Sequence, residues 1–172
     1  MKNTNKKPGN TLLFTFTFLG VFPLILIFLT YFVNPECSIF HYIFINTKNI
    51  PSVTSAFNPL MTKAMDLYCK SAPLLALLVF SLTFKKTKTL KIFNRGNTVR
   101  SCLFSPFVYA ICMYLLMFRN FELTMAGRPL KMMSENNTGL LFSYLMIYIV
   151  IFFMTYAVCY VPVISLKLYK ER

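Results

Sequence analysis

The sequence predicts an all-α membrane protein, and three observations support that fold class. The chain is 56% hydrophobic and 17% aromatic, which is more apolar than an average soluble domain. Long uncharged stretches alternate with short basic segments, as insertion into a bilayer requires. The formal charge of +13 is confined to those short segments and forms no continuous stripe, so we expect no nucleic-acid partner.

The first predicted membrane span is 11–33. A hydrocarbon core of about 30 Å requires roughly 20 helical residues, and this segment meets the requirement without a charge. It follows three lysines, as a signal peptide would, but it is too long for the apolar part of a signal peptide and no small-residue cleavage site follows it. We therefore expect an uncleaved span.

The second predicted span, 63–84, has to include charged residues. The uncharged run 71–84 provides only about 21 Å of helix, so the helix must begin upstream, with Asn58 as N-cap and Pro59 in the first turn. Asp66 and Lys70 are then four residues apart in the order that favours an ion pair. We predict a structural ion pair near the outer end, where Lys70 can extend toward the interface; a direct role at a partner surface is the alternative.

The third and fourth predicted spans are 101–118 and 140–162. The third is just long enough and carries two stripes at helical spacing, a small one of Ser101, Ser105 and Cys112 and a bulky one of Phe104, Phe107 and Ile111. Small residues let membrane helices approach closely, and a stripe that faces lipid is available to a foreign helix. In the fourth span, Pro162 is expected to mark the end of the helix.

The basic residues orient the four spans. Twelve of the eighteen Lys and Arg residues lie before the first span, between the second and third, or after the fourth. The positive-inside rule therefore places both termini in the cytoplasm. In the first outer connection, the apolar segment 38–45 is too short to span, and we expect it to lie in the outer interface. Cys37 and Cys69 are near this side, and the sequence leaves open whether they form a disulfide.

The second outer connection combines Arg119 and Glu122, spaced as a helical pair, with the turn sequence Gly127-Arg128-Pro129. We expect Gly127 to supply backbone freedom and Arg128 to be extended before the proline. A plain turn is one interpretation. The other is that Arg128 faces a partner's carboxylate or a lipid phosphate.

Residues for enzyme chemistry are scarce. The single histidine, His41, has no neighbouring ligand or nucleophile at metal or triad spacing, and no C-x-x-C pair is present. We therefore expect no catalytic residues, no metal and no cofactor. A small membrane transporter or channel subunit is an alternative function, although such proteins often have charged residues facing inward.

Four segments resemble those of the colicin A-type immunity proteins. The stretch 50–73 reads IPSVTSAFNPLMTKAMDLYCKSAP, residues 97–103 read NTVRSCL, the connection 118–133 contains FELT and AGRP, and Thr155-Tyr156 lies in the last predicted span. The resemblance runs from residue 50 to the C-terminus. Residues 34–49 contain no recognised motif.

This resemblance implies a protein of the bacterial inner membrane that binds the pore-forming domain of its cognate colicin, including the toxin's hydrophobic helical hairpin, and prevents channel opening. Membrane lipid would be the other partner. The sequence does not specify which colicin is recognised or the oligomeric state. The candidate partner-binding residues are Phe104, Phe107, Ile111, Phe121, Glu122 and Arg128.

Overall fold

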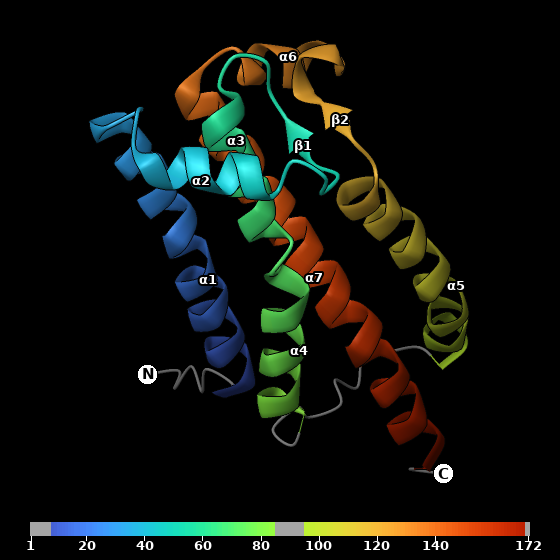
Figure 1. Ribbon diagram of the computed structural model, residues 1–172. Coiled ribbons are helices and arrows are strands. Elements are labelled where there is room, and N and C mark those ends of the chain that lie inside the picture. Colours follow the sequence, from blue (N-terminus) through green and yellow to red (C-terminus); the bar gives the residue numbers. More distant parts are fainter. Residues whose placement is uncertain (1–7, 85–94, 171–172) are drawn as a thin grey trace, which may run out of the picture.

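The computed structural model describes residues 8–84 and 95–170, and the long elements among them are helices that run side by side (Figure 1). The basic N-terminal segment and most of the basic connection after the second predicted span lie outside the described residues. The long helices are α1 (Pro8–Val33), α4 (Ala72–Thr83), α5 (Arg95–Met113) and α7 (Asn137–Lys170).

Three helical segments are long and apolar enough to cross a membrane, namely Leu12–Val33, Pro59–Thr83 and Asn137–Val163. They correspond to the first, second and fourth predicted spans. The third falls in α5 and the π-helical turn η1 (Tyr114–Phe118), whose apolar part is shorter. The all-helical membrane class is thus supported with three candidate spans, and the fourth span stays a prediction.

The second span is interrupted, whereas one continuous helix was expected. Helix α3 (Pro59–Cys69) begins after Asn58, as predicted, but ends at Cys69 with Lys70 as its C-cap, and α4 starts at Ala72. The break is caused by Pro73, which has no N–H to donate to the carbonyl of Cys69 and whose ring would collide with that carbonyl. The prediction for the fourth span was wrong in the opposite sense. Pro162 was expected to end the helix, but α7 continues past it to Lys170.

Helix α7 forms the centre of the bundle. Its fully buried side chains include Leu140, Tyr144, Tyr148 and Phe152, four residues apart along one face. Helix α4 packs closely against it because its buried face carries small residues and branched ones of moderate size: Ala72, Ala76, Val79 and Thr83. Thr83 and Tyr156 link these two helices through their hydroxyls, 3.2 Å apart.

The short elements gather at one end of the bundle, and we call this region, residues 34–58 and 119–136, the cap. It contains α2 (Ser38–Asn46), β1 (Val53–Thr54), β2 (Phe121–Glu122), the 3₁₀ turn η2 (Leu123–Met125) and α6 (Arg128–Ser134). Helix α1 begins and α7 ends at the opposite end (Figure 1). The predicted interfacial segment is helix α2, which lies across the bundle beside α3. Cys37 and Cys69 are free thiols.

Two details of the second connection differ from the prediction. Arg119 and Glu122 form no ion pair within the described residues, because Arg119 is extended and leads into β2, and residues three apart in a strand point to opposite faces. Arg128 is the first residue of α6 and not extended. Gly127, its N-cap residue, has φ −56° and ψ 157°, a conformation open to any residue.

Candidate partner-binding site

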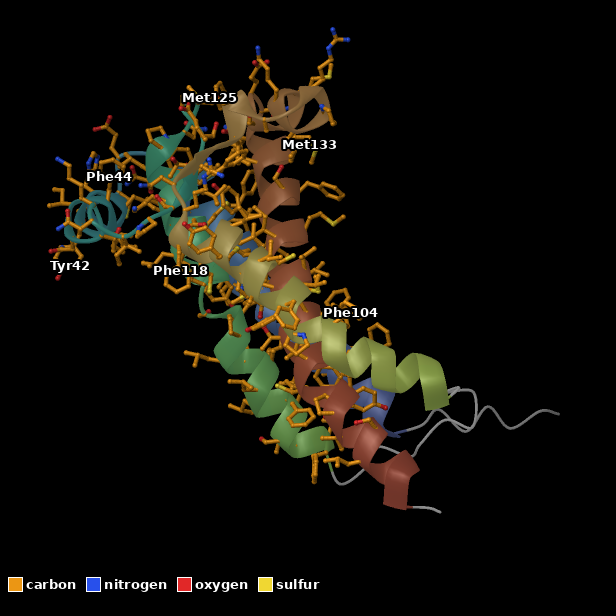
Figure 2. The ribbon with its side chains drawn as sticks, turned by 90° about the vertical axis from the view of Figure 1, so that its right-hand side faces the viewer. Tyr42, Phe44, Phe104, Phe118, Met125 and Met133 are labelled. Carbon is orange, nitrogen blue, oxygen red and sulfur yellow. The ribbon has the colours of Figure 1, made fainter. Side chains whose placement is uncertain are left out.

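One face of α5 and η1 is uncovered. Helix α5 packs against α7, with Met113 and Leu116 against the core and the hydroxyls of Tyr109 and Thr155 3.3 Å apart. Figure 2 looks onto the opposite side, where α5 crosses in front of the bundle and Phe104 and Phe118 are labelled. The exposed apolar side chains of this face, which we call the α5 stripe, are Phe104, Phe107, Val108, Ile111, Tyr114, Leu115 and Phe118.

The three residues predicted on α5 all belong to this stripe. Phe107 has the largest exposed fraction of the three, 68%. The small stripe faces the other way where it is described, since Ser105 and Cys112 are half-buried. The side chain of Ser101 is not among those that the structure describes. The bulky stripe, and not the small one, is therefore the surface available to another molecule.

The stripe ends in the π-helical turn η1, which the sequence did not predict. In a π-helix the turn is wider, with one extra residue, and both Tyr114 and Leu115 are exposed while Leu116 and Met117 are half-buried. Such turns often occur at functional sites. No residue type in this segment distinguishes it from an ordinary α-helical turn, so the sequence carried no signal for it.

Beyond η1 the chain enters the cap through β2, which pairs in parallel with β1. Val53 is opposite Phe121 and Thr54 is opposite Glu122. Phe121 is exposed, and it lies three residues after the last member of the α5 stripe. Glu122 is half-buried and its carboxylate accepts a hydrogen bond from the Thr124 hydroxyl at 2.6 Å. The structure thus places Phe121 at the cap end of the stripe.

Arg128 is the first residue of another element, α6. Its side chain is exposed and forms no ion pair within the part of the chain that the structure describes. It is therefore available at the cap surface, on a different element from Phe121 and Glu122.

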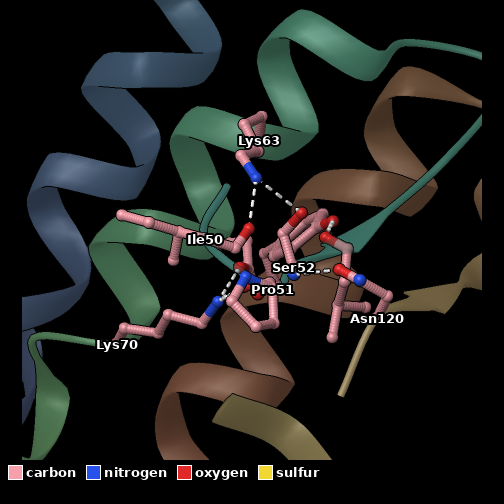
Figure 3. Close-up of polar contacts among 9 residues, drawn as sticks. Ile50, Pro51, Ser52, Lys63, Lys70 and Asn120 are labelled. Carbon is pink, nitrogen blue, oxygen red and sulfur yellow. Dashed lines mark hydrogen bonds and ion pairs between the residues drawn. The ribbon is translucent and has the colours of Figure 1, made fainter. Parts of the chain in front are cut away.

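Asp66 and Lys70 do form the predicted pair, with 2.7 Å between Lys70 Nζ and Asp66 Oδ2. Lys70 does not extend freely toward the interface, because its ammonium also donates to the Pro51 carbonyl (Figure 3). Its side chain is only 14% exposed.

Lys63, one turn earlier on α3, is a functional candidate that the sequence reasoning missed. It is 5% exposed, and its Nζ donates to the Ile50 carbonyl at 2.7 Å and to Ser52 Oγ at 2.9 Å (Figure 3). The signal was present in the sequence, since Lys63, Asp66 and Lys70 follow one helical face.

The segment that these lysines contact is also held by other parts of the molecule. The Tyr144 hydroxyl donates to the Val53 carbonyl at 2.7 Å, and Ser55 Oγ donates to the Ser134 carbonyl at 2.9 Å. Asn58 does not cap α3 with its side chain; it accepts from the Tyr31 hydroxyl at 2.9 Å and donates to Asn137. The first cap connection is therefore a fixed part of the fold.

A second apolar surface lies on another side of the molecule. A cavity of about 520 Å³ opens between α1, α2 and α3, and its lining includes Ile27, Ile43 and Leu67. The hydroxyls of Thr30 and Ser71, which also line it, donate to carbonyls of their own chain segments. The cavity walls therefore offer mainly hydrocarbon. No group of His, Cys, Asp and Glu that could hold a metal occurs among the described residues.

Comparisons with known proteins agree along nearly the whole chain. Residues 36–172 match a family model described as colicin immunity protein. The colicin-A immunity protein of Citrobacter freundii is 46% identical, and the match covers 99% of this chain and 96% of the relative. The colicin-B immunity protein of Escherichia coli is 36% identical, over 99% of this chain and 97% of the relative. No solved structure matches the chain significantly.

Proposed function

Because the chain belongs to the colicin immunity protein family, we propose that it protects the cell that makes it against a pore-forming colicin. It does so by binding the pore-forming domain of that toxin in the inner membrane and preventing the channel from opening. The resemblance on which the sequence prediction rested is confirmed by the two relatives and the family match. Binding requires no turnover and no cofactor.

We propose four membrane spans, and the pairing of β1 with β2 supports this number. The pair joins the connection after α1 to the connection after α5, so both connections lie on one side of the membrane. Helices α3 and α4 lead away from that side, and the chain has to cross back before β2. The segment Arg95–Phe118 can make this return crossing, because α5 and η1 together are about 36 Å long.

The orientation follows from the basic residues. Arg95 begins α5 and Lys170 ends α7, at the end of the bundle opposite the cap (Figure 1). The positive-inside rule places that end in the cytoplasm and the cap on the outer side of the inner membrane. The cap therefore faces the side from which a colicin arrives.

The single observation that carries the binding mode is the uncovered α5 stripe. In lipid, helices associate through close packing of side chains and not through the hydrophobic effect, and the stripe offers aromatic and branched side chains along one face. We propose that it packs against the hydrophobic helical hairpin of the toxin. Phe121, Glu122 and Arg128 would contact toxin residues just outside the hydrocarbon.

Inhibition then follows from differential affinity. A protein that binds the closed arrangement of the toxin better than the open one shifts the equilibrium toward the closed arrangement. A shift from 99:1 to 1:99 requires a preference of about 10⁴, or about 5.5 kcal/mol. Most interface side chains contribute less than about 1 kcal/mol each, so an extended surface such as the α5 stripe suits a preference of this size.

The test is to express the chain in sensitive cells and challenge them with colicins A and B and with a colicin that lacks a pore-forming domain. We expect protection against at least one of the first two and none against the third. Protection against no pore-forming colicin would reject the proposal. The alternative, a transporter or channel subunit, predicts ion flux in vesicles that contain the chain without any toxin.

A further inference from the structure

Lys63 is buried on α3 without forming an ion pair inside the described part of the chain. Asp66 pairs with Lys70, so the buried face of α3 carries two ammonium groups and one carboxylate. Removing an ammonium from water is costly, and apolar side chains of similar volume are often as stabilising or more so at such positions. What Lys63 adds over a methionine is its two hydrogen bonds, to Ile50 and Ser52.

Apart from the Asp66 carboxylate, the acceptors of both lysines lie on three consecutive residues. Lys63 binds the Ile50 carbonyl and the Ser52 hydroxyl, and Lys70 binds the Pro51 carbonyl (Figure 3). Hydrogen bonds from a charged donor are stronger than those between neutral groups. The two lysines therefore fix residues 50–52 firmly against α3.

The backbone of Ser52 links these fixed residues to the second connection by two hydrogen bonds. Its N–H donates to Asn120 Oδ1 at 2.9 Å, and its carbonyl accepts from the Phe121 N–H at 3.2 Å. The strand pair that follows has only two residues on each side, and so short a pair is not stable alone. The position of β2 therefore depends on how residues 50–54 are held.

We propose that Lys63 and Lys70 are positioning residues for toxin recognition. They hold residues 50–54, and thereby β2 with Phe121, at the cap end of the α5 stripe. The lysines themselves lie on another helix: α3 packs against α1, α2 and α7, whereas α5 packs against α7. This inference deepens the proposed function and rests on it. The toxin surface that meets Phe121 is selected by residues that the toxin does not touch.

The first arm of the test needs no toxin. A Val53→Cys/Phe121→Cys variant should form a disulfide in membranes, since paired strand residues lie within bonding range, and the single-cysteine variants serve as controls. Adding Lys63→Met should lower the yield about tenfold. Lys63→Arg, which keeps the charge and the donors, should restore most of it, and Lys48→Met, at an exposed cap lysine, should leave it unchanged.

The second arm measures photocrosslinking to bound colicin from position 121 and from position 107, together with the toxin dose that kills. Lys63→Met should abolish the crosslink from position 121, keep that from position 107, and lower protection about tenfold at an unchanged amount of protein in the membrane. Asn120→Ala changes an exposed residue and should have the same effect. Combining the two should cost no more than either alone.

Three outcomes would overturn the proposal: an unchanged crosslink from position 121, an equal loss at positions 121 and 107, or additive effects of Lys63→Met and Asn120→Ala. If the Lys63→Met variant does not accumulate in the membrane, the same measurements on Lys70→Met and Asn120→Ala distinguish these outcomes from the expected one. If the Val53→Cys/Phe121→Cys variant forms its disulfide while the wild-type chain protects against no colicin, the proposed function is refuted and the toxin-free arm stays interpretable.

Discussion

Two glycines that flank α6 have opposite surroundings. A Cβ atom built on Gly139 would lie 2.8 Å from Met133 Cα and would also collide with the Met133 carbonyl oxygen, whereas nothing lies within 4 Å of a Cβ built on Gly127. Backbone atoms cannot move aside as a flexible side chain can. The close approach at Gly139 therefore sets how α6 turns into α7.

We predict that Gly139→Ala destabilises the protein by about 1–3 kcal/mol, since overpacking forces the backbone apart. The matched control, Gly127→Ala, should change stability by less than about 0.5 kcal/mol, because its φ of −56° suits alanine. Thermal unfolding in detergent micelles measures both. Equal unfolding temperatures for the two variants would contradict the steric argument.

Single residues show how far sequence reasoning extends. The pairing of Asp66 with Lys70 follows from helical spacing alone, which is a local property. The partners of Asn58, by contrast, are Tyr31 and Asn137, and the acceptors of Lys63 lie 11 and 13 residues upstream. Such contacts depend on the tertiary arrangement, so a short motif can indicate the role of a residue but cannot identify its hydrogen-bond partner.

At the level of elements, the α5 stripe can be tested against a lipid-facing control. Phe107→Ala removes an exposed side chain and should leave the unfolding temperature nearly unchanged while lowering protection about tenfold or more, as for an interface hot spot. Leu78→Ala removes an exposed apolar side chain from α4 and should leave protection unchanged. The measurement is the toxin dose that kills half of the cells, at matched protein levels. A similar loss for both variants would argue against the stripe.

The helices were predictable because an apolar run long enough to cross a bilayer is a strong signal. The break before Pro73 and the continuation of α7 through Pro162 were not predictable. A proline interrupts a membrane helix at some positions and is tolerated at others, depending on whether the surrounding groups satisfy the freed backbone carbonyl. The strands β1 and β2 have two residues each and lie 68 positions apart. Pairs of this kind leave no periodic pattern in the sequence.

At the scale of the whole molecule, the cavity between α1, α2 and α3 is an alternative to the α5 stripe as the proposed site of toxin binding. Ile43→Trp should fill much of the cavity from α2. We predict that this variant protects as well as the unchanged chain, because the proposed binding surface lies on α5 and not in the cavity. Photocrosslinking from position 43 should then capture lipid, and a crosslink to colicin there would move the binding site to the cavity.

The number of spans decides where the cap lies. With three spans, α5 would not cross, and the connections that contain Lys48 and Arg128 would lie on opposite sides of the membrane. The pairing of β1 with β2 is incompatible with that separation. We therefore predict that Lys48→Cys and Arg128→Cys, each in a chain without its native cysteines, react with a membrane-impermeant maleimide in intact spheroplasts. Lys167→Cys, at the opposite end of α7, should react only after lysis. Labelling of position 48 without position 128 would contradict both the fourth span and a cap built from the two connections. The reason is that the pairing of β1 with β2 keeps both residues on the same side of the membrane.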